Sequence, residues 1–260
     1  MPIEIIPVRS HKIIEESDSL LEVFFEALKQ SEVDLKDGDI LVVTSKVVSV
    51  TEGRSIPFSK IQPGDEAKAL SKEAKLPPEF IQIVLDNSKS HTGLVPGALT
   101  TLNKYGLLAN AGADLSNAGP DKVIVFPKDP KESAKMLHDA IKESGINVGI
   151  ILADSRMTPL RSGTIGLALA TYGFNPIVDE RGKMDLYGRP MKVTTRAVAD
   201  QLASAAELVM GETDERIPFV VIRGYSFSEI KSEDEYELIG QIDPKDCMFL
   251  GSFLKKGGFV

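Results

Sequence analysis

The chain of 260 residues carries 30 Lys and Arg against 38 Asp and Glu, a formal net charge of −8, and 42% of its residues are hydrophobic. This acidic balance argues against a nonspecific nucleic-acid binder, which needs an excess of basic residues. The one cysteine, Cys247, excludes an intrachain disulfide, and no apolar run approaches the ~20 residues that cross a bilayer. The first residues lack the basic start and long apolar stretch of a signal peptide, so we expect a cytoplasmic protein.

Short apolar runs alternate with amphipathic stretches, which is typical of mixed α/β structure. Residues 3–8 predict a first strand. A helix follows, because Leu21, Phe24, Phe25 and Leu28 recur at helical spacing, and Ser17 and Asp18 precede them as candidate N-caps. Residues 40–43 predict a buried strand. A polar break such as residues 44–46, at the end of a buried strand, could mark the edge of a ligand site. We favour the interpretation as a bend or bulge, after which the strand resumes at 47–48.

The middle and end of the chain continue this alternation. Residues 63–74 and 77–85 predict two short helices, and residues 103–106 predict a hairpin turn. Asp129 is the expected cap of a helix that runs to Gly145. A strand at 148–152, a helix at 195–210 and a strand at 217–222 follow. The last thirty or so residues are acidic and weakly patterned, so we expect them to be peripheral to a single domain spanning residues 1–260.

Several common catalytic motifs are absent. The sequence has no GxxxxGK[ST] phosphate loop, no GxGxxG after a strand and no GxSxG nucleophile elbow. The histidines show no ligand spacing, and His138 is expected at the surface or the edge of the core. Cys247 lies late in the chain among acidic residues, and we expect no catalytic role for it.

Two acidic residues, Asp114 and Asp154, are candidates for ligand binding. The run Asn110–Asn117 contains small residues that let a ligand approach the backbone, with Asp114 as an oxygen ligand for Mg²⁺ or Mn²⁺. A polar turn is an equally good interpretation of that run. Asp154 follows the predicted strand 149–152, where α/β proteins place ligands. The alternative is that Asp154 caps a turn, since Pro159 and Gly163 indicate a loop.

Two further segments could hold an anionic group. Residues 156–196 contain seven basic and three acidic residues, a net charge of +4 within an acidic chain. Arginine matches phosphate and carboxylate geometry, so this segment suits a phosphorylated, polyanionic substrate, although a solvated hairpin with surface ion pairs explains it equally well. After the helix at 195–210, Gly211 and Glu212 could hold a metal-phosphate group, but such a glycine more often simply ends a helix.

Taken together, these segments resemble the coenzyme F420:L-glutamate ligase family. The resemblance covers about residues 7–224, and its segments follow one another in the same order as in the family. It is carried by the strings GDILVVTSKVVSVTEGR, PEFIQIVLDNS, NAGADLSN, ADS, RGKMDLYGRPMKVTTRAVADQLASAAELVMGE and IPFVVIRG.

The resemblance implies a GTP-dependent ligase that joins L-glutamate to the carboxylate of a deazaflavin-phospholactate through an acyl phosphate. It also implies an intertwined homodimer with a two-lobed α/β fold and no P-loop, two divalent ions (Mg²⁺ or Mn²⁺), and stimulation by K⁺. Residues 225–260 lie outside the similarity. The alternatives are a related amide ligase for another phosphorylated carboxylate, and a nucleotide- or deazaflavin-binding protein without activity.

Site roles follow residue by residue from the same resemblance. The metal ligands would be Asp114, Asp154, Ser155 and Glu212. The nucleotide would contact Ser10, His11, Lys12, Ile13, Ser45, Lys46, Asn117, Glu207, Leu208, Val209, Met210, Gly211, Thr213 and Asp214. Arg156 and Arg161 would act beside Asp154 in catalysis, and Arg189 would bind substrate.

The sequence departs from the family pattern at two places. Val50 stands where the family often has a lysine. Lys46 is a candidate substitute, since in a strand the two residues share a face if no bulge intervenes. The string RMTPLR at 156–161 keeps the terminal arginine of the family run but not its aromatic residue or its glycine.

Overall fold

The computed structural model describes residues 2–227 and 242–251. Within these residues the chain divides into two compact units. Unit 1 comprises residues up to 48, 129–155 and those from 165 to 227; unit 2 comprises 49–128, 156–164 and the residues from 242. None of the helices in the described ranges has the length and apolar character that a bilayer crossing requires. The mixed α/β class predicted from the sequence is confirmed.

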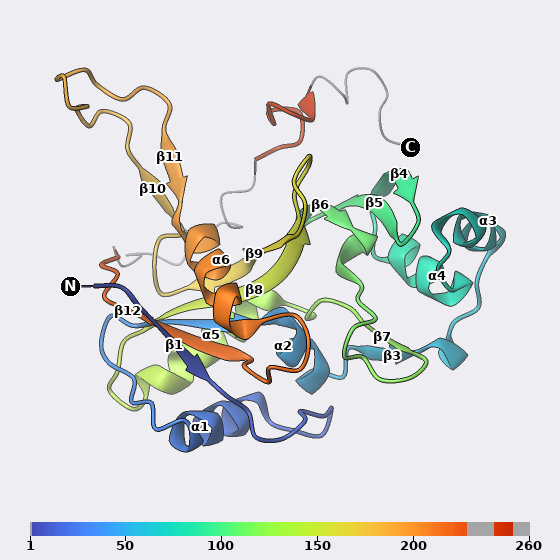
Figure 1. Cartoon of the computed structure of the whole chain (residues 1–260), viewed down its shortest axis with the longest axis horizontal. Coiled ribbons are helices and arrows are strands. Elements are labelled where there is room, and N and C mark those ends of the chain that lie inside the picture. The colour runs from blue at the N-terminus through green and yellow to red at the C-terminus, as the bar shows by residue number, and fades with distance from the viewer. Residues whose placement is uncertain (1, 228–241, 252–260) are drawn as a thin grey trace. The chain divides into compact units, whose positions relative to one another are not determined.

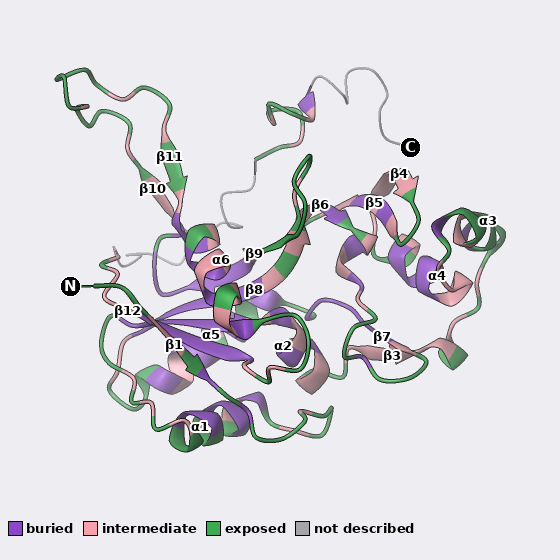
Figure 2. Ribbon diagram, in the orientation of Figure 1, coloured by how far each residue is buried: buried purple, intermediate pink, exposed green. Residues whose placement is uncertain are grey.

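Unit 1 contains a five-stranded sheet. Its order is β1 (Glu4–Val8), β12 (Phe219–Arg223), β2 (Ile40–Thr44), β8 (Gly149–Met157) and β9 (Thr164–Tyr172). Strand β2 runs parallel to β8 and antiparallel to β12. The central strands are buried on both faces (Figure 2), which explains why Ile40–Val43 is apolar without alternation.

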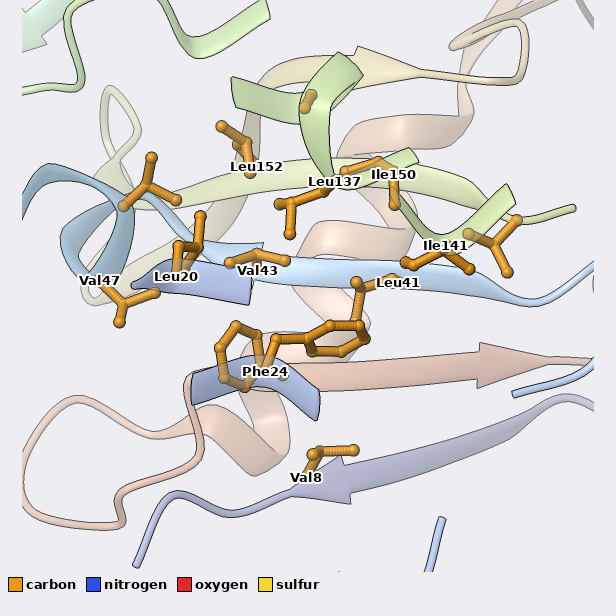
Figure 3. Close-up of a cluster of buried hydrophobic side chains, with 14 of the residues drawn as sticks. Val8, Leu20, Phe24, Leu41, Val43, Val47, Leu137, Ile141, Ile150 and Leu152 are labelled. Carbon is orange, nitrogen blue, oxygen red and sulfur yellow. The ribbon is translucent and has the colours of Figure 1, made fainter. Parts of the chain in front are cut away.

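Helices cover both faces of this sheet (Figure 1). On one face, α1 (Leu20–Gln30) and α5 (Pro130–Lys142) pack against the side chains of Leu41 and Val43 (Figure 3). On the other face, α6 (Val198–Met210) packs against Ile40 and Val42. Because successive side chains of a strand point to opposite faces, one short apolar run contributes to both cores.

The predicted helices are confirmed, with changed ends. The cap of α1 is Ser19, whose hydroxyl accepts from the Glu22 N–H, so the prediction of Ser17 and Asp18 as caps was wrong. Asp18 instead accepts from the Glu15 N–H and from the Lys12 ammonium, a local polar contact that competes with capping. The cap of α5 is Asp129, as predicted, and its helix ends at Lys142 rather than at Gly145.

His138 lies in the core, 6% exposed, rather than at the surface. Its ring Nδ1 lies 2.8 Å from the Val148 carbonyl oxygen. It packs beside the Tyr172 ring, with 5.0 Å between the ring centroids. Since α5 presents this position to the sheet, the imidazole is a satisfied core group.

The bend predicted at 44–46 is instead the start of a helix, α2 (Ser45–Thr51). Val47 and Val48 favour strands by propensity, but in the helix both are buried against the core of unit 1, and this tertiary packing overrides the propensity. The argument that Lys46 and Val50 share a face of a strand is therefore wrong in its geometry. Four residues apart on a helix, they still lie on one face.

Two boundaries near the end of the described chain also move. Residues 195–197, expected to open the helix, form β11 (Thr195–Ala197), which pairs antiparallel with β10 (Ile177–Asp179). This pairing competes with the first helical turn, so α6 begins at Val198. The strand expected at 217–222 is β12, which begins at Phe219. Of the peripheral tail, 228–241 and 252–260 lie outside the described residues.

Unit 2 is built from short elements around its own core. A meander of β4 (Ser90–Val95), β5 (Ala98–Asn103) and β6 (Gly106–Ala109) confirms the hairpin turn predicted at 103–106. The remaining elements are β3 (Ser55–Pro57) paired with β7 (Lys122–Ile124), the 3-10 turns Phe58–Lys60 and Asn110–Gly112, and the two helices α3 (Asp65–Ala74) and α4 (Pro78–Asp86). The core of unit 2 is centred on Phe80, Ile81, Leu99 and Val123.

Candidate functional site

The register of the unit 1 sheet aligns one edge. Val8 lies opposite Phe219, Phe219 opposite Val43, and Val43 opposite Leu152, so four strands reach the same row. The chain leaves β1, β2 and β8 past this row and enters β12 at it. Segments far apart in the sequence therefore project from one edge of the sheet, where α/β proteins bind ligands.

Two segments predicted to contact the nucleotide meet at this edge. The Ser10 N–H donates to the Arg216 carbonyl oxygen at 2.9 Å, and the Thr44 N–H donates to the Pro218 carbonyl oxygen at 3.0 Å. These bonds fix residues 10–13 and the start of α2 beside the loop that follows α6. The structure thus brings together the N-terminal segment, Ser45 and the loop at 211–217.

Asp154 and Ser155 lie at the same edge. Strand β8 does not end at Leu152 but continues to Met157 beside β9, so Asp154 is a strand residue and not the cap of a turn. The Ser45 hydroxyl donates to Asp154 Oδ1 at 3.2 Å, and the Ser155 hydroxyl donates to Glu212 Oε2 at 3.2 Å. Adjacent residues of one strand thus reach α2 on one side and the loop after α6 on the other.

Glu207, in the last turn of α6, completes an acidic group with Asp154 and Glu212. Burial of its carboxyl, a hydrogen bond with the Glu212 side chain and the negative charges of Glu212 and Asp154 raise the pKa of Glu207 to about 8, although the Gly166 N–H opposes this by donating to it. Its Oε1 atom is buried and makes no hydrogen bond within the part of the chain that the structure describes. The Glu207 carboxyl is therefore protonated at neutral pH and faces two acidic neighbours.

Gly166 allows this arrangement because β9 passes directly against α6. A Cβ at Gly166 would lie 2.5 Å from the carbonyl oxygen of Ala203. The Ser204 hydroxyl donates to the Gly166 carbonyl oxygen at 2.6 Å, which holds the two backbones together. Only glycine permits such close contact, so β9 and α6 set the position of Glu207 jointly.

The raised pKa of Glu207 predicts a pH dependence of stability. In the folded protein the pKa lies near 8, above the ordinary value of 4.5, so the protonated carboxyl favours folding at low pH. This contribution is complete below the ordinary value and is lost as pH rises through the folded value. We expect the free energy of unfolding to fall from about pH 5 to about pH 9. The fall should be only on the order of 1 kcal/mol, because solvent screens this partly exposed group. Urea unfolding at a series of pH values measures this change in the free energy of unfolding.

The matched variant is Glu207→Gln, which keeps the shape and cannot ionise. Its unfolding free energy should lack this component of the pH slope. The same slope in Glu207→Gln and in the unchanged protein would contradict the assignment to Glu207.

The NAGADLSN run belongs to unit 2, and much of it serves the fold there. Asn110 accepts the Leu99 N–H at 2.9 Å, and a Cβ at Gly112, where φ is +79°, would clash with the Phe126 ring. Asp114 accepts from the Ser116 N–H at 2.7 Å and from the Ser116 hydroxyl at 2.8 Å. The polar turn is thus present in the structure. The ligand role of Asp114 and the nucleotide role of exposed Asn117 stay predictions.

The basic segment largely pairs within itself. Its three acidic residues bind their neighbours, as Asp179 does with Arg181, Glu180 with Lys183 and Arg196, and Asp185 with Arg189. Surface ion pairs within the hairpin therefore account for most of its basic residues. In unit 2, Arg156 donates to the Tyr105 carbonyl oxygen at 3.2 Å and lies 6.0 Å from the Phe126 ring centroid, while Arg161 is exposed.

One cavity in unit 1 includes residues that the sequence did not single out. Its volume is about 250 Å³, and it is lined by residues 10–12 together with Val23, Glu26, Ala27 and Gln30. The four α1 residues follow helical spacing and form one face of the helix. Their position opposite Ser10–Lys12 could not be known before the strand β1 and the helix were placed together.

The oxygen donors at the edge suit a hard divalent cation. Asp154, Ser155 and Glu212 offer carboxylate and hydroxyl oxygens, which Mg²⁺ and Mn²⁺ prefer, and the crowded acids around Glu207 would be relieved by a positive charge. Within residues 2–227 and 242–251, however, no three Asp, Glu, His or Cys side chains are grouped closely enough to hold a metal ion. The metal set that includes Asp114 remains a prediction.

Comparisons with known proteins agree on one family. The family described as F420-0:gamma-glutamyl ligase matches residues 9–224. The chain is 39% identical over 220 residues to a protein of Methanopyrus kandleri named coenzyme F420:L-glutamate ligase, covering 84% of this chain and 85% of the relative. A protein of Archaeoglobus fulgidus with the same name is 36% identical, covering 92% and 97%. The chain therefore belongs to the F420-0:gamma-glutamyl ligase family, whose members are enzymes that form amide bonds.

Proposed function

We propose that this enzyme joins L-glutamate to the carboxylate of a deazaflavin-phospholactate in coenzyme F420 biosynthesis, at the expense of GTP. Its relatives are named coenzyme F420:L-glutamate ligase, and this name supports the proposed substrates. The observation that supports the site is the shared edge of the unit 1 sheet, where Asp154, Ser155, Glu207 and Glu212 lie beside the N-terminal segment 10–13.

The proposed reaction needs positioning more than covalent catalysis. A carboxylate becomes a good electrophile once it is phosphorylated, and the glutamate amine then attacks the acyl phosphate with loss of phosphate. Two divalent ions, Mg²⁺ or Mn²⁺, would neutralise charge on the transferred phosphoryl group, and K⁺ would stimulate the enzyme. The sequence motifs include no nucleophilic Cys and no Ser-His pair, which is consistent with this chemistry.

The residues of this chain would divide the work. Asp154, whose carboxylate accepts a hydrogen bond from the Ser45 hydroxyl, would ligate the divalent ions together with Ser155 and Glu212. Asp114 would supply the fourth protein ligand. Ser10–Ile13, Lys46, Asn117 and the segment 207–214 would contact the nucleotide. Arg156, Arg161 and Arg189 would bind the phosphodiester and the glutamate carboxylates, because guanidinium groups match both geometrically.

An exposed hairpin supports the proposal that the enzyme is a homodimer. Figure 1 shows the long hairpin that joins β10 and β11. Its large apolar side chains are between 67% and 100% exposed, namely Met184, Leu186, Tyr187 and Val193. Large apolar side chains exposed together favour a protein contact. We further propose that the enzyme works in the cytoplasm, in keeping with its single cysteine.

Mass spectrometry tests the function directly. The protein, the unglutamylated deazaflavin-phospholactate, GTP, Mn²⁺ and L-glutamate are incubated together. We expect a product heavier by one or more glutamate residues, formed only when all components are present. If no such mass increment forms with either Mn²⁺ or Mg²⁺, with or without K⁺, the proposed function is wrong.

A further inference from the structure

We propose that Glu215 is a positioning residue that holds Glu212 in place in the loop between α6 and β12. The inference rests on the proposed role of Glu212 as a ligand of a divalent ion. It adds a residue to which neither the sequence patterns nor the resemblance to the family gave a role. The hydrogen bonds of the Glu215 carboxylate and its position over Gly211 support it.

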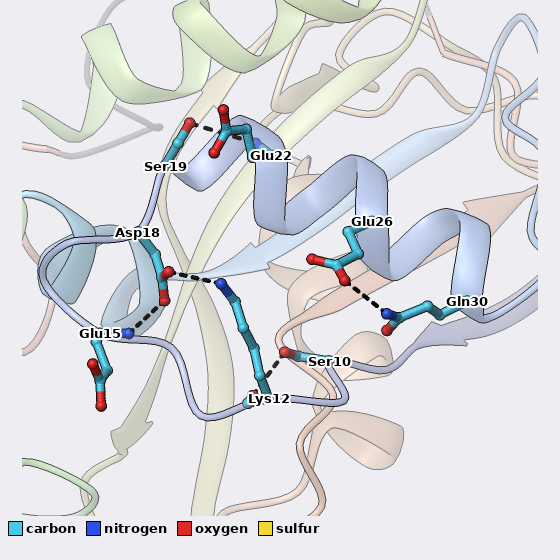
Figure 4. Close-up of polar contacts among 8 residues, drawn as sticks. All are labelled: Ser10, Lys12, Glu15, Asp18, Ser19, Glu22, Glu26 and Gln30. Atoms are coloured by element: carbon cyan, nitrogen blue, oxygen red, sulfur yellow. Dashed lines mark hydrogen bonds and ion pairs between the residues drawn. The ribbon is translucent and has the colours of Figure 1, made fainter.

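Glu212 lies in the loop that joins α6 to β12 (Figure 1), and backbone contacts hold both ends of this loop. At its start, the Gly211 N–H donates to a carbonyl oxygen in the last turn of α6 at 3.0 Å. Near its end, the Arg216 carbonyl oxygen accepts from the Ser10 N–H at 2.9 Å. The Ser10 hydroxyl in turn donates to the Lys12 carbonyl oxygen at 2.8 Å (Figure 4), so the loop is tied to a segment that is itself ordered.

The Glu215 carboxylate holds the middle of the loop. The Thr213 N–H donates to Glu215 Oε2 at 2.8 Å, and the Thr213 hydroxyl donates to Glu215 Oε1 at 3.1 Å. Hydrogen bonds from its own backbone N–H and from Thr213 keep the pKa of Glu215 below its ordinary value. The same carboxylate occupies the space over Gly211, where φ is +68° and a Cβ would clash with it. Glycine at this position therefore serves the contact with Glu215 as well as the end of the helix.

Glu215 thus holds the backbone on both sides of Glu212. Gly211, directly before Glu212, lies under the Glu215 carboxylate, and Thr213, directly after it, donates to that carboxylate. With both neighbours held, the Glu212 side chain is directed toward Ser155, whose hydroxyl donates to Glu212 Oε2 at 3.2 Å. Groups that orient a metal ligand are often worth about 10–100-fold in metal affinity.

Two variants separate position from charge. Glu215→Gln keeps the length of the side chain but removes the charge and leaves one acceptor oxygen for the donors of Thr213. Glu215→Asp keeps the charge, but its carboxylate is one methylene shorter and draws away from Thr213 and Gly211. If Glu215 acted only by its charge near a cation, Glu215→Asp would bind Mn²⁺ as the unchanged protein does. A positioning role predicts that both variants bind Mn²⁺ about ten-fold more weakly.

Mn²⁺ binding is measured by electron paramagnetic resonance, with and without GTP, and without glutamate or the deazaflavin substrate, so that no turnover contributes. A titration of GTP without protein gives the metal that the nucleotide holds by itself. Asp37→Asn is the matched control, because the Asp37 carboxylate accepts the Asn147 N–H at 2.8 Å at the opposite end of the strands β2 and β8. This control should bind Mn²⁺ as the unchanged protein does, and thermal unfolding shows whether each variant is folded.

Unchanged Mn²⁺ affinity in either Glu215 variant would overturn the inference. So would a loss of affinity that only follows a loss of thermal stability in both variants, or a lack of Mn²⁺ binding by the unchanged protein. These outcomes are separate from the proposed function. Weaker Mn²⁺ binding by both variants, without glutamate addition by the unchanged protein, would support the positioning role and refute the ligase. Glutamate addition by the unchanged protein, with normal Mn²⁺ binding by the Glu215 variants, would refute the positioning role alone.

Discussion

Asp154→Asn is expected to abolish glutamate addition while the protein stays folded. The substitution removes one negative charge from the edge of the sheet but keeps an oxygen that can accept from the Ser45 hydroxyl. Removing a single group that stabilises developing charge in a transition state costs about 10²–10³-fold in rate. Because the carboxylate would also neutralise a bound cation, we expect a loss at the upper end of that range, measured as the initial rate of the glutamate mass increment.

Asp139→Asn provides the matched control for Asp154→Asn. Asp139 lies on α5, where its partly exposed carboxylate pairs with the Lys135 ammonium at 2.6 Å. An exposed pair contributes little, so this variant should retain the rate and the thermal unfolding temperature of the unchanged protein. Near-normal turnover by Asp154→Asn, with both variants equally folded, would remove Asp154 from the reaction.

The sequence predicted unit 1 well where one local signal decides the structure. Strand β2 is a continuous apolar run, and α5 begins with an Asp-Pro pair that caps and starts a helix. It predicted α2 wrongly because Val47 and Val48 favour a strand locally, and only the burial of both side chains in the assembled core makes the helix better. Likewise, β8 extends past Asp154 because β9, formed later in the chain, supplies a partner.

Sequence patterns pointed to some residues of the candidate site, whose roles stay predictions, but not to the geometry that brings them together. The position of Asp154 after a buried apolar run and the glycine after α6 pointed to two parts of the site. The alignment of Val8, Phe219, Val43 and Leu152 in one row depends on pairing between strands more than 100 residues apart in sequence, which no local pattern encodes. The same is true of the Glu207 carboxyl, whose raised pKa depends on residues from the strand β8 and the loop after α6.

Arg223→Ala is expected to destabilise unit 1 strongly. The guanidinium donates to both carboxylate oxygens of Asp39, at 2.9 and 2.8 Å, and to the Asp34 carbonyl oxygen at 2.8 Å. The Asp39 side chain is only 2% exposed. The hydrogen bonds to Asp39 raise the pKa of Arg223 above its ordinary value, so the guanidinium stays charged. Removing one partner leaves a buried charge, which costs about 3–5 kcal/mol of unfolding free energy.

A double-mutant cycle shows whether that cost comes from the stranded charge. Asp39→Asn removes the charge but retains an oxygen for the Lys36 N–H, which donates to it at 2.8 Å. In denaturant unfolding, Arg223→Ala combined with Asp39→Asn should therefore lose clearly less than the sum of the two single losses. The control Lys135→Ala, which breaks the exposed pair on α5, should cost no more than about 0.5 kcal/mol. If the two losses simply add, the pair is not coupled. The start of β2 and the end of β12 would then be connected by backbone pairing alone. This pairing also aligns the acidic edge at the other end of both strands.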